Sequence, residues 1–574
     1  MDRNMLLIFV LIAVAVFGSQ LLMKKYAPQN KSTAQPTQPI QSGAPSTPPA
    51  VQAQPGPAVP AKKSGLPTST KQADSESQIV VENDLYRITF TNRGAQVKSW
   101  VLKKFQDDHG QPLDLVNNTN AAKYGYPLSL WTYDQAQRDK LNSALYVPGS
   151  TAPTLSAPGD LTFDYSDSGL TVRKTFKFDN SYAVGVETSV FLNDAPVWAF
   201  PAWPVGLGDQ TNVPAYAAGQ FEFQSNGNND HLASKKVAGG ATLTGTYNWA
   251  GVSSQYFAAA FIPDKPEDVR IVTLRNSVDA AASATSSEIK AADALGVAVG
   301  HPGESRERLF VGPKSLEVLE AVSVPTIVGA DKDLRAIVNF GSLGLIARPL
   351  FAWPFIGLRW MHEHLIRNWG WAIVIQTLVI TIALLPLRFY QMKSALKMQR
   401  VQPQMKAIQE KYKKYSMGDP RKQEMQKEIG ALYKREGVNP VGGCLPLLVQ
   451  LPFLWAYYRM LGAAIDLRQA HWLWIHDLSA RDPIFLLPAL MVVSMFLMQR
   501  ISPQAGMDPA QQRMMNIMMP AMMGFIFFNL PAGLNLYYAE SNLISMAQQW
   551  VMNKTELGRE MREIAAKRAR KKDK

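Results

Sequence analysis

The stretch that decides the fold of this chain is Ala431-Leu-Tyr-Lys-Arg-Glu-Gly-Val-Asn-Pro-Val-Gly-Gly-Cys-Leu-Pro-Leu-Leu-Val-Gln-Leu-Pro452. It joins a basic segment to an apolar one. Upstream, residues 388–443 contain 13 Lys or Arg and 5 Asp or Glu. Downstream, Cys444 to Ile465 is apolar apart from Arg459. At about 1.5 Å per residue this apolar run is long enough to cross a bilayer of about 30 Å. The junction therefore predicts a membrane-spanning helix next to a charged aqueous segment.

Five further stretches have the apolarity of membrane spans. They are Met5–Met23, Trp369–Leu387, Ile484–Met498, Met514–Leu530 and Leu534–Val551. No clear small-residue cleavage site follows the first of them, which favours an uncleaved anchor over a signal peptide. Residues 529–533 (Asn-Leu-Pro-Ala-Gly) make a tight hairpin of the last two. We therefore expect six spans: an N-terminal anchor helix and an α-helical bundle of five core transmembrane helices.

Positive charge in short flanking loops decides the orientation of such spans. The formal net charge is +13, and its excess is local: the tail at 552–574 has 9 Lys or Arg against 4 Asp or Glu, and residues 388–443 are basic as well. The loop at 462–483 has two Arg and three Asp. We therefore expect both basic regions and both termini on the cytoplasmic side. Lys24 and Lys25, which follow the first span, oppose this orientation, but the downstream bias is larger.

The region between the first two spans has two parts. Residues 27–78 are rich in Pro, Ser, Thr, Gln and Ala, and such a composition buries too little apolar surface to offset its chain entropy, so it predicts a disordered tether. From 79 to 332, short runs alternate apolar and polar residues and are broken by Gly, Asn, Asp and Pro, which predicts an all-β sandwich domain. The clearest predicted strands are Ile79–Val81, Tyr86–Phe90, Leu170–Phe178 and Tyr182–Phe191.

Helical pattern returns near Asp333, and aromatic and basic residues are concentrated in 340–366. Trp353, Arg359 and Trp360 beside apolar residues predict an amphipathic segment lying in the membrane interface, with an ordinary packed helix as the alternative.

The basic stretch 388–443 is itself predicted to form a helical hairpin. Apolar and aromatic residues recur there at roughly helical spacing, at Met398, Met405, Ile408, Tyr412 and Tyr415. Ser416–Pro420 is expected to turn the chain, and a second helix is expected from about Arg421 to Arg435. The basic faces of the hairpin are either solvated or lie on anionic lipid or ribosomal RNA.

Polar residues within the predicted spans indicate a possible binding surface. Thr377 and Thr381 are four residues apart and share a helix face, with Gln376 adjacent. A second polar stripe, at i, i+3 and i+7 of the last span, consists of Asn535, Tyr538 and Asn542. The alternative for each residue is structural, because Thr and Asn commonly hydrogen-bond between helices in membranes.

Two charged residues, Arg459 and Glu540, lie within predicted spans, where a charge needs a partner or water. At about 100° per residue, Glu540 falls about 200° from Tyr538 and so points away from the second stripe. This favours a structural Arg459–Glu540 ion pair. The alternative is that Arg459 supplies positive charge to the polar surface.

The sequence has no pattern typical of an enzyme. Neither His362 with His364 nor His471 with His476 has the spacing and carboxylate neighbours of a metal site, and there is no phosphate-binding glycine loop. Cys444 is the single cysteine, so an intrachain disulfide cannot form. We therefore expect no catalytic residues, no metal and no cofactor.

The stretch at 431–452 closely resembles the signature of the YidC/Oxa/Alb membrane protein insertases. Further segments with the same resemblance are Leu467-Arg-Gln-Ala470, Trp474-Ile-His-Asp-Leu-Ser-Ala480 and Pro531-Ala-Gly-Leu-Asn-Leu-Tyr-Tyr538. The likeness covers about 335–555. By position and strand pattern, the tether and β domain are similar to the periplasmic part of the Gram-negative members, a sugar-mutarotase-like supersandwich.

The resemblance implies a bacterial inner-membrane protein that inserts and helps fold nascent membrane proteins, alone or with the Sec translocon. Its five core helices would enclose a polar groove open to cytoplasm and lipid but closed on the outside. The implied groove residues are Gln376, Thr377, Thr381, Leu451, Leu454, Arg459, Asn535, Tyr538 and Asn542. The implied partners are nascent membrane proteins, the Sec translocon, the ribosome and anionic lipid, and DNA is not among them. The alternative is a secondary transporter or channel for a small solute.

This chain departs from the family at one implied position. Many members carry an arginine five residues before the proline that matches Pro386, and here that residue is Thr381. The expected domains are a transmembrane anchor (1–26), a disordered periplasmic tether (27–78), a periplasmic β-supersandwich (79–332), an interfacial amphipathic segment (333–366), a five-helix insertase core (367–552) that includes the cytoplasmic hairpin (388–443), and a basic cytoplasmic tail (553–574).

Overall fold

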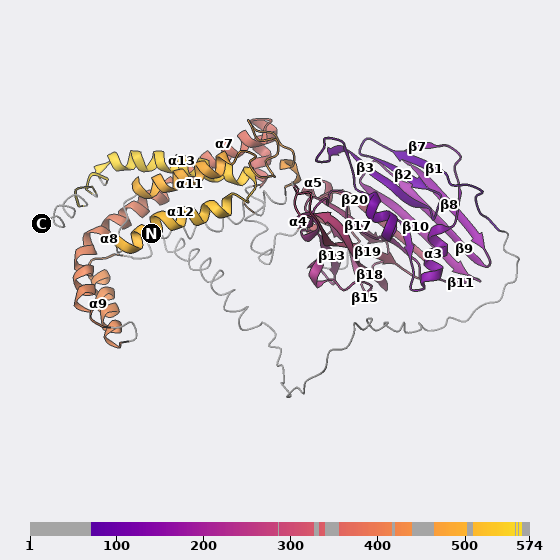
Figure 1. Cartoon of the computed structure of the whole chain (residues 1–574), viewed down its shortest axis with the longest axis horizontal. Coiled ribbons are helices and arrows are strands. Elements are labelled where there is room, and N and C mark those ends of the chain that lie inside the picture. The colour runs from indigo at the N-terminus through magenta and orange to yellow at the C-terminus, as the bar shows by residue number, and fades with distance from the viewer. Residues whose placement is uncertain are drawn as a thin grey trace. The chain divides into compact units, whose positions relative to one another are not determined.

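The fold is taken from a computed structural model, in which strands form the first half of the described chain and helices the second (Figure 1). It describes residues 70–284, 286–325, 332–338, 355–415, 419–438, 458, 464–501, 509–556, 558–560 and 562–564. The predicted anchor, residues 27–69 of the predicted tether, and nearly all of the predicted span from Cys444 to Ile465 lie outside these residues.

Three sheets make up the β domain, and the pairs between named strands are antiparallel except for β1 with β7. The first sheet has the order β4 (Pro112–Asp114), β3 (Gln96–Gln106), β2 (Tyr86–Thr91), β1 (Gln78–Glu82), β7 (Thr154–Ser156). The second has the order β14 (Asn228–Ala233), β13 (Gln220–Ser225), β16 (Tyr247–Ser253), β17 (Phe257–Pro263), β20 (Glu304–Pro313), β10 (Ala183–Leu192), β9 (Leu170–Phe178), β8 (Gly159–Asp167), β6 (Val147–Pro148), with β11 (Ala195–Pro196) on β10. The third has the order β15 (Thr242–Gly245), β18 (Val269–Ala281), β19 (Ile289–Gly300), β12 (Phe200–Trp203), β5 (Ser129–Trp131).

Short helices lie between these strands or follow the last of them. They are α2 (Asn118–Tyr124), α3 (Gln135–Ser143), α4 (Val213–Ala217), α5 (Leu316–Glu320) and the 3₁₀ turns η1 (Ser234–Lys236) and η2 (Leu334–Ile337). α2, α3 and α4 are each capped by an Asn or Asp side chain that accepts from a backbone N–H of the first turn.

Alternation of apolar and polar residues explains why β9 is a strand. Val172 and Phe176 point into the core, while Arg173 and Lys177 are exposed on the other face. The strands predicted around 79–81, 86–90, 170–178 and 182–191 are confirmed by β1, β2, β9 and β10. One residue breaks the pattern: Lys174 lies on the buried face, and its ammonium donates to three backbone carbonyls.

The helical region contains a helix over 355–364, then α7 (Trp369–Ala383), α8 (Leu385–Lys411), α9 (Arg421–Arg435), η4 (Ile465–Leu467), α11 (Leu486–Ile501), α12 (Pro509–Phe527) and α13 (Ala532–Lys554). Among the described residues no single helix combines the length and apolarity of a membrane span, and only α7 and α8 together do so. The six predicted spans therefore stay a prediction.

The predicted span from Trp369 to Leu387 is bent in the structure. α7 ends at Ala383, and α8 begins at Leu385 with its axis turned by 46°. Pro386 lies in the first turn of α8, where its missing N–H costs nothing, but it would remove a hydrogen bond from the interior of a continuous helix.

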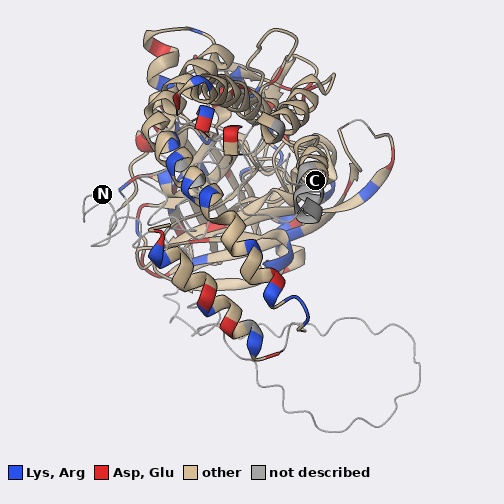
Figure 2. Ribbon diagram, turned by 90° about the vertical axis from the view of Figure 1, so that its left-hand side faces the viewer, with Lys and Arg blue, Asp and Glu red and all other residues tan. Residues whose placement is uncertain are grey.

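α8 and α9 form the predicted helical hairpin, and the predicted second helix is confirmed residue for residue. An apolar seam, which includes Val401, Met405 and Leu432, packs between the two helices. Tyr412 donates to Glu428 at 2.9 Å and Lys411 pairs with the same carboxylate at 2.7 Å. Figure 2 shows basic and acidic residues along both helices of this hairpin, in the lower part of the view.

Candidate functional site

The predicted polar pair of α7 lies at its contact with α13. Thr377 and Thr381 are buried, and their hydroxyls donate to the carbonyls of Ile373 at 2.8 Å and Thr377 at 2.6 Å. Gln548 of α13 reaches across and donates to the carbonyl of Thr381 at 3.3 Å. Thr381 is among the last four residues of α7, where helix carbonyls lack a donor within their own helix, so Gln548 supplies one from the neighbouring helix.

The lipid-type face of α7 is clearly separated from this contact. Leu378, Val379 and Ile382 are 43%, 51% and 55% exposed, whereas Thr377 is fully buried. Gln376 is also buried, beside Gly357 of the helix over 355–364. The polar side of α7 is therefore covered by other helices.

The second predicted stripe faces the other neighbours of α13. The Asn535 amide donates to the carbonyls of Phe527 at 3.1 Å and Leu530 at 3.2 Å, at the end of α12. The Asn542 amide donates to Ser494 of α11 at 3.2 Å. The Tyr538 ring packs edge-on against Phe527, with 4.6 Å between ring centroids.

The stripe on α7 therefore contacts one side of α13. The stripe on α13 itself points the other way, toward α11 and the end of α12. Glu540, not the Asn535–Asn542 stripe, is the residue that meets the threonines: its partly buried carboxylate interacts with the hydroxyl of Thr377. The remaining predicted groove residues, Leu451, Leu454 and Arg459, lie outside the described residues. The expected Arg459–Glu540 pair is consequently untested.

An apolar cluster, called here the end cluster, closes the bundle where α7 begins. Its buried members come from the helix over 355–364, the start of α7, the loop at 464–485, and the starts of α11 and α13. They include Leu358, Ile373, Trp472, Ile475, Leu478, Leu487, Ala532 and Leu534. Backbone bonds tie the loop to α13, from Gly533 N to Leu478 O at 2.8 Å and from Ala532 N to Ala480 O at 2.6 Å. The Asn368 amide adds a bond to His471 O at 2.9 Å.

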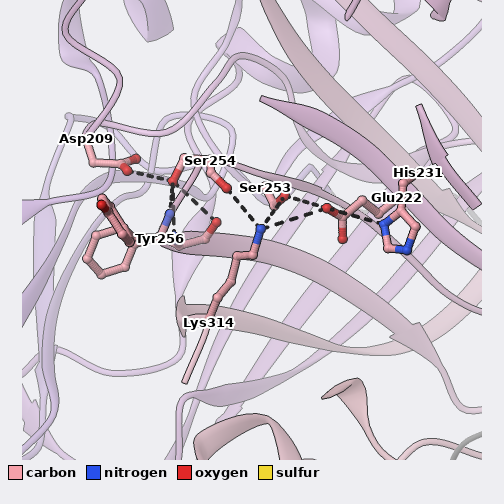
Figure 3. A network of polar contacts seen from close by, with 8 residues as sticks. Asp209, Glu222, His231, Ser253, Ser254, Tyr256 and Lys314 are labelled. Carbon is pink, nitrogen blue, oxygen red and sulfur yellow. Dashed lines mark hydrogen bonds and ion pairs between the residues drawn. The ribbon is translucent and has the colours of Figure 1, made fainter. Parts of the chain in front are cut away.

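A buried polar network in the β domain was not predicted from the sequence (Figure 3). Glu222 on β13 is fully buried and accepts from Ser253 at 2.7 Å, while Lys314 donates to Ser253 at 3.2 Å and to the Ser254 carbonyl at 3.1 Å. At the other end of the network, Ser254 donates to Asp209 at 2.6 Å. Burial raises the pKa of Asp209 to about 6.

This network ties β13, β16 and the end of β20 together, because each charged group meets a group of opposite charge or a hydroxyl. The Glu222 signal was present in the sequence, as the single acidic residue of an alternating strand, Gln-Phe-Glu-Phe-Gln at 220–224. Alternation places Glu222 on the face opposite Phe221 and Phe223, but not in the interior. Only the packing of the sheets reveals that both faces are covered.

Two family models match the chain. Residues 78–353 match the YidC periplasmic domain, and residues 360–559 match the 60Kd inner membrane protein family. Together they describe an inner-membrane protein with a periplasmic domain, and they divide the chain where strands give way to helices.

Whole-chain comparisons agree. The membrane protein insertase YidC of Syntrophus aciditrophicus is 30% identical over 96% of this chain and 100% of its own length. That of Bordetella avium is 32% identical over 85% of both chains. A crystal structure of an active YidC insertase with its first transmembrane domain resolved aligns with 19% identity and a TM-score of 0.34, covering 85% of this chain and 95% of that chain. This chain is a member of the YidC family of membrane protein insertases.

Proposed function

We propose that this insertase receives the polar part of an incoming segment at the α7–α13 contact while its apolar part enters the lipid. The observation that carries the proposal is the polar surface between α7 and α13, formed by the buried Thr377 and Thr381 and the partly buried Glu540 and Gln548. Membership of the insertase family excludes the alternative of a secondary transporter or channel for a small solute.

The physical need for such a surface is plain. Moving an unpaired peptide-like polar group from water into hydrocarbon costs several kcal/mol, about 4–8 by transfer to cyclohexane. Threonine hydroxyls and helix carbonyls that still have acceptor capacity offset part of this cost. The reaction needs no bond to be made or broken, so the residues act by solvation and not by covalent catalysis.

The end cluster supports a groove that is closed at one end. Trp472, Ile475 and Leu478 fill the space between α7 and α13 on the side where α7 begins. The opposite end of α7 leads into the α8–α9 hairpin. We propose that the closed end faces the periplasm and the hairpin faces the cytoplasm, as the distribution of basic residues indicates.

The same proposal includes the finer architecture. The membrane part comprises the anchor at 1–26 and five core spans, both termini lie in the cytoplasm, and the periplasmic β domain is a supersandwich. The basic hairpin contacts the ribosome or anionic lipid, and the Sec translocon is a partner for part of the substrates. The many charged residues of α8 and α9 support the hairpin contacts.

Site-specific crosslinking tests the groove. In a Cys444→Ser background, single cysteines at Thr377, Thr381, Leu451 and Tyr538 are placed opposite a stalled nascent membrane protein that carries a crosslinker. Strong products are expected from Thr377 and Thr381. The matched control is Val379→Cys, two residues from both threonines and 51% exposed on the other face of α7. Equal labelling at Thr377 and Val379 would contradict the groove assignment.

A further inference from the structure

The described surroundings of Glu540 do not satisfy the hydrogen-bonding capacity of its carboxylate. It is partly buried on α13 and interacts with the Thr377 hydroxyl. Its Oε2 atom is buried and has no hydrogen-bond partner among the described residues. The single hydrogen of the Thr377 hydroxyl is already directed at Ile373 O, at 2.8 Å, so the carboxylate competes for it.

The sequence supplies few cations on the two helices that meet here. α7 has no charged residue, and α13 has only Glu540 and Lys554, which lies fourteen residues away at the far end of that helix. Arg388, at the start of α8, donates to Ser545, a different residue of α13. Glu540 thus supplies the charge of the proposed binding surface.

Glu540 also lies at the edge of an open side of α13. Ala547 and Val551 follow it at i+7 and i+11, within about 20° of the same direction, and both are exposed. Within the described residues, this side of α13 is therefore exposed from Ala547 to Val551, beyond Glu540.

We propose that Glu540 sets the charge preference of the groove, so that incoming segments carrying lysine, arginine or a free amino group are favoured over acidic ones. This rests on the proposed groove. A carboxylate in a medium of low dielectric gains most when a cation supplies both hydrogen bonds and opposite charge. An acidic group arriving at the same position meets like charge and loses water without compensation.

Substrates that differ in one charge test the proposal in the full-length protein. A single-span test protein with a short translocated tail carries Lys, Gln or Glu at one tail position, and protease protection in reconstituted vesicles reports its insertion. The protein is expected to insert the Lys tail in preference to the Glu tail. Glu540→Gln is expected to reduce the ratio of Lys-tail to Glu-tail insertion by about five- to tenfold, the effect of one partly solvated charge pair.

Two further variants sharpen the result. Glu556→Gln removes the same charge from an exposed position beyond α13, and it should leave the ratio unchanged. Thr381→Arg places a cation one turn from Thr377 and should lower the ratio further, toward a preference for acidic tails.

Three outcomes overturn the proposal in distinguishable ways. An unchanged ratio in Glu540→Gln, with Thr377→Cys still crosslinked to the tail, rejects the charge preference and leaves the groove standing. If Glu540→Gln lowers the yield of folded protein for all tails alike, and adding Arg459→Met restores it, Glu540 is a structural ion-pair partner. Absence of any crosslink at Thr377 rejects the groove itself.

Discussion

Gly370, in the first turn of α7, is where the end cluster is packed most tightly. A Cβ added there would lie 2.2 Å from both Cγ and Cδ1 of Trp472 and 2.6 Å from its Cβ. Real Cβ atoms do not approach other atoms this closely, so α7 or Trp472 must move. The substitution Gly370→Ala is therefore a direct test of how rigidly the closed end is built.

The Trp472 ring has little room to retreat. Its backbone forms two hydrogen bonds of 2.8 Å with Ile475. Its ring packs against the rings of Trp371 and Trp474, with centroid distances of 5.7 and 5.6 Å. Overpacking of this kind costs about 1–3 kcal/mol, and the contact is close enough to reach the upper end of that range. Replacing glycine by alanine in a helix returns up to about 1 kcal/mol. We expect a net loss of about 2 kcal/mol.

Thermal unfolding of the full chain in detergent, followed by the fraction that stays monodisperse on size-exclusion chromatography, measures this loss. Gly430→Ala is the matched control: Gly430 is also helical, in α9, and its added Cβ has no atom within 4 Å, so its Tm should rise slightly. In a Trp472→Gly background, which removes the Cβ, Cγ and Cδ1 atoms of Trp472, Gly370→Ala should cost little. If Gly370→Ala raises Tm as much as Gly430→Ala does, the end cluster is not a rigid closure.

Three further predictions concern the β domain. Lys174→Met leaves three carbonyls without their donor and should lower the free energy of unfolding by about 3 kcal/mol or more. Lys177→Met, on the exposed face of the same strand, should lower it by under about 1 kcal/mol. Similar losses in the two variants, measured by thermal unfolding, would contradict this. Burial raises the pKa of Glu307 from 4.5 to about 8, so the folded form holds this proton more tightly than the unfolded form. The stability gained from this proton is complete below about pH 4.5 and is lost as pH rises through 8. Glu307→Gln should therefore flatten the dependence of Tm on pH. Deleting about 80–320 while keeping 335–365 should leave most substrates inserted in a depletion assay, and complete loss with a folded bundle would refute that independence.

Much of the fold follows from local pattern. β9 was predicted from the alternation in 170–178, because a strand that separates two environments must alternate. α9 was predicted as the helix that follows the turn ending at Pro420, and its bounds agree. A span was predicted over Trp369–Leu387, but its bend after Ala383 was not, because apolarity alone does not distinguish one straight helix from two bent ones.

The candidate site was predicted in its residue types but not in its arrangement. Helical spacing places Thr377 with Thr381, and separates Glu540 from Tyr538 by about 200°, because both are angles within one helix. Which neighbour each face meets depends on how the helices pack around α13, and no periodicity within a single helix contains that information. Only the tertiary structure brings Glu540 to Thr377, and Asn542 to Ser494.

The burial of charge shows the same division between sequence and tertiary structure. The sequence by itself determined membership of the YidC family and the order of a β domain followed by apolar helices. It could do so because motifs, alternation and hydropathy are properties of residues that are adjacent in the chain. The interior positions of Lys174 and Glu222 were decided only in the folded domain. Each is stabilised by groups far away in the sequence, the carbonyls of Gly94 and Leu128 for Lys174 and the Ser253 hydroxyl for Glu222. A buried charge is tolerated only when the fold supplies its hydrogen-bond partners, and those partners exist together only once distant strands have paired.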